Sequence, residues 1–214
     1  MSKVTMETVA DDLAYARSIA EEGRAAPLLG GRQFVIWGLV VVIGSMFTWA
    51  TVSRAAPFPP VSILFVWLGL TAAGWIYSFA TGSKLAQKPG AQTTGAKVEQ
   101  AVWVASGAFF GLLATSFTFV AATGANGEAA AWLLYAALPP VIFGVYAVAL
   151  TATMVASSAS YLKPFIVLSY IFAIITALLI GSLFQFFATS IGILLVSVVP
   201  GVLMLRREPD DLAS

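Results

Sequence analysis

The sequence predicts an all-α, polytopic membrane protein with six transmembrane helices arranged as three hairpins, preceded by a cytoplasmic amphipathic helix. Of the 214 residues, 59% are hydrophobic and only 10% are charged, whereas about a quarter of an ordinary soluble domain is charged. The apolar residues are gathered into runs close to the roughly 20 residues that a helix needs to cross a bilayer. Nearly all of the basic residues fall on one of the two sides of the membrane that these runs define.

Six apolar runs are the expected spans: Gln33 to Val52, Val61 to Ala80, Ala101 to Ala122, Ala130 to Ala156, Pro164 to Ser182 and Phe187 to Leu205. The chain then divides into a cytoplasmic tail over residues 1–32, a transmembrane domain over residues 33–205 and a short cytoplasmic tail over residues 206–214. Pro139 and Pro140 predict a kink in the fourth run, because proline lacks a backbone donor. An alternative places an interfacial helix over Ala129 to Leu138 and starts the span at Pro139.

Residues 164–205 form one stretch without a charged side chain. A single helix of that length would be about twice as long as the bilayer core is thick. Small and polar residues gather near its midpoint, where a tight turn needs them; they are Gly181, Ser182, Gln185, Thr189, Ser190 and Gly192. We therefore expect two helices folded into a hairpin, with the turn near Gln185.

The distribution of lysine and arginine agrees with six crossings. With the N-terminus in the cytoplasm, every Lys and Arg except Arg54 falls on the cytoplasmic side. Cytoplasmic loops carry such an excess of positive charge. Five crossings would leave Arg206 and Arg207 outside, so the charges predict that both termini are cytoplasmic.

An amphipathic pattern precedes the first span. Apolar residues at alternating three- and four-residue steps share one face of a helix; they are Met6, Val9, Leu13, Ala16 and Ala20. This face could dock a partner protein or a second copy of the chain. Alternatively, it packs against the spans of its own chain or lies on the membrane surface.

The composition excludes several kinds of chemistry. The chain has no cysteine and no histidine, which removes thiol catalysis, imidazole ligands and the commonest general base. No Asp, Glu, Lys, Arg or His falls in the centre of a span, and Glu99 is expected at the cytoplasmic lip of the third span, solvated by water. Serines and threonines have no base to activate them. We therefore expect no enzyme, no cofactor and no metal, and the scattered basic residues argue against nucleic-acid binding.

Two sets of residues are candidates for functional or packing sites. Gly107, Gly111 and Thr115 follow one another at four-residue steps, and such small residues let two helix backbones approach closely. Their partner could be a neighbouring span or another subunit. A ligand cavity could form where kinks open space and phenol groups orient a ligand; its candidate residues are Pro139, Pro140, Tyr146, Tyr170 and Pro200.

The run "EEGRAAPLLGGRQFVIWG", with Asp11-Asp12-Leu13 before it and "VPGVLMLRREP" near the C-terminus, resembles uncharacterised small six-pass inner-membrane proteins of bacteria. The resemblance implies a bacterial inner membrane and brings no activity. Two functions remain open. The chain is expected to be a non-catalytic membrane subunit or regulator that docks a partner, or alternatively a small carrier or substrate-binding component for an uncharged or amphipathic molecule.

Overall fold

The computed structural model describes residues 11–15, 17, 28–86, 91, 93–124 and 127–207, and this part of the chain is helical throughout, joined by short turns. The helices are α2 (Gly31–Val52), α3 (Ser62–Ala86), α4 (Thr94–Thr123), α5 (Gly127–Ser157), α6 (Lys163–Leu178), α7 (Phe184–Ile193) and α8 (Val199–Leu205). A 3-10 turn, η1 (Ser160–Leu162), precedes α6, and a π-helical turn, η2 (Leu194–Val198), joins α7 to α8. The predicted all-α fold is confirmed.

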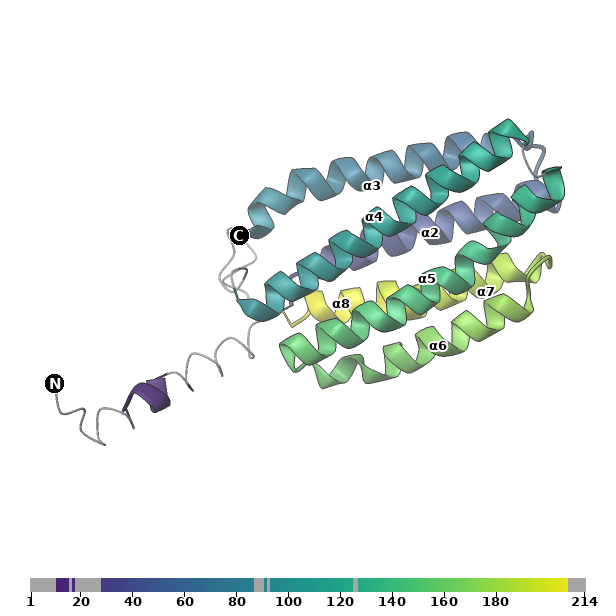
Figure 1. The fold of residues 1–214 in the computed structure, drawn as a ribbon. Coiled ribbons are helices and arrows are strands. Elements are labelled where there is room, and N and C mark those ends of the chain that lie inside the picture. Colours follow the sequence, from purple (N-terminus) through teal and green to yellow (C-terminus); the bar gives the residue numbers. More distant parts are fainter. Residues whose placement is uncertain are drawn as a thin grey trace.

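Six helical segments are long and apolar enough to cross a membrane: α2, α3, α4, α5, η1 with α6, and the continuous segment from α7 through η2 to α8. They run side by side, and consecutive segments point in opposite directions (Figure 1). Five described basic side chains lie at the end where α2 begins and α8 stops, and they are Arg32, Lys97, Lys163, Arg206 and Arg207. We call this the basic end; Arg54 lies at the opposite end.

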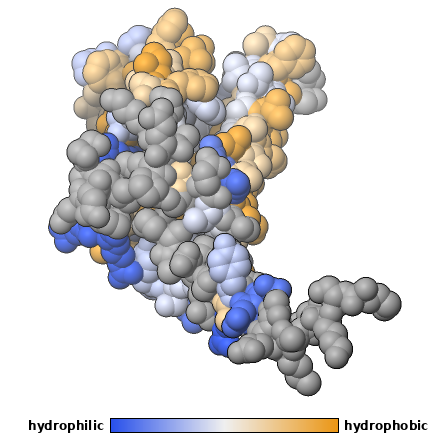
Figure 2. Space-filling model, turned by 90° about the vertical axis from the view of Figure 1, so that its left-hand side faces the viewer, coloured by the Kyte–Doolittle hydropathy of each residue, from blue (hydrophilic) through white to orange (hydrophobic). Residues whose placement is uncertain are grey.

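The six segments divide into an inner group and two outer helices. α2 packs along the segment α7–η2–α8, and α5 packs extensively against α6. α3 packs on α2, and α4 packs on α5, but α3 and α4 make little or no contact with each other. Only 6% of the most apolar stretch of α3 or of α4 is buried, against 50% in the last segment. In the end-on view the upper part of the molecule separates into two largely apolar arms (Figure 2).

Local signals explain both ends of α4. Thr93 has an extended backbone, and its hydroxyl accepts a hydrogen bond from the Ala96 N–H at 3.3 Å, which caps the first turn. Gly124, with φ of 62°, ends the helix in the left-handed conformation that glycine adopts without strain. α4 thus starts seven residues before the apolar run that begins at Ala101. Glu99 therefore belongs to the helix itself.

The predicted hairpin within residues 164–205 is present. α6 ends at Leu178, Gly181 takes a φ of 84°, and α7 begins at Phe184. The prediction for the other small and polar residues of this region was wrong in part. Gln185, Thr189, Ser190 and Gly192 lie inside α7 and are buried, because they pack between helices instead of forming the turn.

α5 and the last segment both stay helical through their internal prolines. α5 is one helix through Pro139 and Pro140, so the alternative of a separate interfacial helix does not apply. In the last segment, η2 lies immediately before α8, which carries Pro200 near its start. Proline cannot donate the hydrogen bond that an α-helix needs at that position, and the Val199 N–H instead reaches back five residues to the Leu194 carbonyl.

Candidate functional site

Tyr146 and Pro200, two of the residues predicted to line a cavity, are buried in the core of the described bundle. Tyr146 is buried in the core, where its hydroxyl lies 3.2 Å from the Ser197 hydroxyl. Its ring contacts those of Phe34 and Trp103, with centroids 6.4 and 5.0 Å away. Pro200 is completely buried in α8. Tyr146 therefore joins α2, α5 and the last segment as a packing residue.

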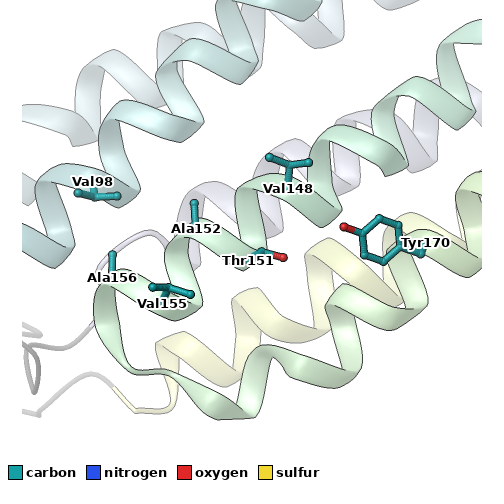
Figure 3. Close-up of a pocket in the computed structure, with 7 residues that line it drawn as sticks. All are labelled: Val98, Val148, Thr151, Ala152, Val155, Ala156 and Tyr170. Atoms are coloured by element: carbon teal, nitrogen blue, oxygen red, sulfur yellow. The ribbon is translucent and has the colours of Figure 1, made fainter.

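Tyr170 instead lines an open groove of about 480 Å³ on the outside of the bundle. The groove runs from α4 across α5 to α6, and its lining consists of Val98, Val148, Thr151, Ala152, Val155, Ala156 and Tyr170. The Tyr170 hydroxyl points toward α5 (Figure 3). The Thr151 hydroxyl donates to the carbonyl of Ala147 at 2.7 Å, so the groove is mostly apolar with two oxygen atoms at its wall.

Gly107, Gly111 and Thr115 of α4 face open space. A Cβ atom added at Gly107 or at Gly111 would meet nothing within 4 Å. Thr115 is exposed, and its hydroxyl donates to the Gly111 carbonyl of its own helix at 2.7 Å. We call Gly107, Gly111 and Thr115 the open α4 face. Of the two partners considered from the sequence, no neighbouring span within the described part of the chain occupies this face.

Close backbone packing occurs elsewhere, between α2 and the last segment. A Cβ atom at Gly31 would lie 2.7 Å from the Gly201 carbonyl oxygen, and one at Gly201 would lie 2.8 Å from the Gly31 carbonyl oxygen. At Gly38 an added Cβ would lie 3.0 Å from the Ser197 hydroxyl. Gly31, Gly38 and Ser45 are all buried. Their seven-residue spacing was the signal that could have identified this interface in the sequence.

Glu99 departs most from the sequence-based expectation. It was expected to be solvated at the lip of its span, but only 5% of its surface is exposed. Its Oε1 atom is buried without a hydrogen-bond partner. The burial of this oxygen is explained by Gly30, since a Cβ atom added at Gly30 would lie 2.5 Å from it. The chain that enters α2 therefore covers the carboxyl group, and it can approach so closely because Gly30 has no side chain.

Two further side chains complete this corner of the basic end. The Arg207 guanidinium carbon lies 3.9 Å from the centre of the Tyr161 ring, which is a cation–π contact. Tyr161 is close enough to both Glu99 and Arg207 to respond to their charges. No group of three acidic, histidine or cysteine side chains that could hold a metal ion occurs within the described ranges.

The predicted docking helix is described only in part. Residues 11–15 are helical, and Leu13 is exposed. Met6, Val9, Ala16 and Ala20 lie outside the described residues, so the proposed apolar face stays a prediction.

No protein-family model, curated protein or solved structure matches this chain. The fold defines its class directly, as an α-helical membrane protein with six segments able to cross a bilayer. The resemblance at the two termini stays a prediction.

Proposed function

We propose that this chain is a non-catalytic subunit or regulator in a bacterial inner membrane, and that it binds another transmembrane helix through the open α4 face. The observation that carries this proposal is the unfilled space at Gly107 and Gly111. Two such glycines one turn apart let a second backbone come close and gain dispersion contacts that lipid chains match poorly.

The position of α4 supports the same proposal. α4 packs on α5 through its other side, where the Trp103 indole N–H donates to Thr153 at 3.2 Å. Its outward side is free along its length within the described bundle, since α3 makes little or no contact with it. A helix from a partner or a second copy could therefore lie against α4 without displacing any span.

The orientation follows from the charges. The basic end would face the cytoplasm, because positively charged residues are retained on that side of the membrane. The amphipathic segment that contains Leu13 would then lie in the cytoplasm, where it could add a second contact to the same partner. The remaining apolar surface of the six segments would be covered by membrane lipids.

Native mass spectrometry of gently extracted, full-length protein tests this function. We expect the wild type to retain a second chain, either a copy of itself or another protein. Gly111→Leu should lose that chain, because the added side chain fills the space needed for close approach. Gly69→Leu is the matched control, since Gly69 on α3 also faces open space. A wild type that is strictly monomeric, or a Gly111→Leu protein that keeps its partner, would contradict the proposal.

A second candidate function is supported by the groove at Tyr170. A small carrier or substrate-binding component would need a lipid-accessible site with few polar atoms, and this groove offers two hydroxyl oxygens, from Thr151 and Tyr170. In this case a small uncharged or amphipathic molecule should remain bound after extraction. It should be lost in Tyr170→Ala, while Tyr135→Ala, at the other end of α5, should leave it in place. Wild-type protein without any retained molecule would exclude this candidate.

A further inference from the structure

We propose that Glu99 is a proton-binding site that controls closure of the basic end of the bundle. In the closed state the carboxyl group is neutral and packs under Gly30. In the open state the carboxylate is exposed to water, and the stretch from Leu28 to Gly30 has moved away from it. This proposal stands independently of the partner that α4 binds.

The surroundings of Glu99 Oε1 favour a neutral carboxyl group. The oxygen is buried, no group in the described part of the chain donates a hydrogen bond to it, and Gly30 lies directly against it. A buried carboxylate without a partner is far more costly than a buried neutral acid. Oε1 is enclosed next to Gly30, and the described residues offer no set of further ligands that would hold a metal ion beside it. A proton needs neither additional ligands nor additional space.

The charged groups around Glu99 do not stabilise a carboxylate at this position. On the other described elements at this corner, the titratable and charged groups that act on Glu99 directly or through one another are Tyr161, in η1, and Arg207, beyond α8. Arg207 is held over the Tyr161 ring instead of pairing with Glu99. The facing stretch Leu28 to Gly30 carries no charge, and neither does the end of α5, which meets α4 at Gly95. Among the described residues, this corner therefore contains no counter-ion paired with the Glu99 carboxyl group.

The stretch from Leu28 to Gly30 links ionisation of Glu99 to a movement of the chain. Leu28 and Leu29 are buried, with 7% and 4% of their surfaces exposed, and they lead directly into α2. Ionisation of Glu99 breaks its O–H bond, the proton passes to a water molecule, and the carboxylate keeps the electron pair. The charged group then needs water around it, which can reach Oε1 only if Leu28 to Gly30 separates from α4. Proton release and opening are thus one coupled event.

Infrared spectroscopy of the full-length protein in lipid nanodiscs tests the protonation state. At about pH 6, solvent-exposed carboxyl groups are ionised, and the ester groups of the lipids do not titrate, so a carboxylic-acid C=O band in a pH-difference spectrum would come from a shielded side chain. We expect this band in the wild type, its loss as the pH is raised to about 9, and its absence in Glu99→Gln. A wild type without the band at about pH 6, or a Glu99→Gln protein that keeps it, would overturn the proposal.

Cysteine labelling tests the coupled opening. The natural chain has no cysteine, so Leu29→Cys introduces a single thiol at a buried position. Its rate of reaction with a maleimide is divided by the rate for the double variant Leu29→Cys/Glu99→Gln. This ratio removes the intrinsic pH dependence of the thiol, because both variants carry the same cysteine. We expect a ratio near one at about pH 6 that rises at least about threefold by about pH 9. A ratio that stays constant over this range would show that Glu99 does not control the opening.

Discussion

The side-chain amide of Gln185 donates a hydrogen bond to the backbone carbonyl of Ala136 at 2.7 Å. Ala136 stands four residues before Pro140, which has no N–H to offer that carbonyl. The same amide nitrogen donates to the Thr176 carbonyl at 3.0 Å, in the last turn of α6, where helix carbonyls lack partners within the helix. One buried amide therefore joins α5, α6 and α7 by satisfying two carbonyls that their own helices leave unpaired.

Gln185→Leu should destabilise the protein by about 2–4 kcal/mol, because two buried carbonyls lose their donors. SDS-induced unfolding of the reconstituted protein measures this loss. The matched test adds Pro140→Ala, which returns a backbone N–H to the Ala136 carbonyl. We expect the loss to be smaller in the Pro140→Ala background. An equal loss in both backgrounds would mean that Gln185 does not compensate for the proline.

Replacing glycine by alanine should change stability in opposite directions at the packed interface between α2 and α8 and on the open α4 face. Gly201→Ala should destabilise by about 1–3 kcal/mol, since the new methyl group would push α8 away from the Gly31 carbonyl. Gly111→Ala should be neutral or stabilising by up to about 1 kcal/mol, because its Cβ meets open space and alanine favours the helix. The unfolding midpoints of the two variants, each compared with that of the wild type, measure these stability changes. Shifts of the same sign and size would contradict the assignment of the two faces.

The contact of Trp103 with Thr153 should be measurable as a pairwise coupling. Thr153 is completely buried, and its hydroxyl accepts the Trp103 indole hydrogen bond. Thr153→Val keeps the shape but removes the acceptor, which should cost about 1 kcal/mol. The cost should disappear in a Trp103→Phe background. Thr151→Val is the control, since that hydroxyl bonds only within its own helix and its loss should not depend on Trp103.

Most of the helical architecture could be predicted from the sequence because the apolar runs are long and their solvent is lipid. The hairpin within residues 164–205 followed mainly from length, since one crossing cannot absorb that stretch, and the small residues near its midpoint and the charges at its end agreed with it. The exact start of α4 could not be predicted, because a helix can continue beyond the apolar run. This is why Glu99 was placed in water, whereas the structure buries it beneath Gly30.

Side-chain partnerships across the fold were the least predictable part. The sequence shows that Pro140 leaves the Ala136 carbonyl without its helical donor, but it does not show that Gln185 supplies one from 49 residues away. The small residues at Gly107 and Gly111 were recognisable as a packing face. Whether a span of the same chain covers that face depends on which side of α4 meets α5, and the sequence contains no direct signal for this.

The proposed function requires six crossings with the basic end in the cytoplasm, and single-cysteine labelling in intact cells tests this topology most directly. Ala55→Cys and Leu183→Cys, at the opposite end, should react with a membrane-impermeant maleimide added outside. Lys97→Cys and Lys163→Cys, at the basic end, should react only after the membrane is permeabilised. Labelling of either basic-end cysteine in intact cells, or protection of either opposite-end cysteine, would contradict this topology.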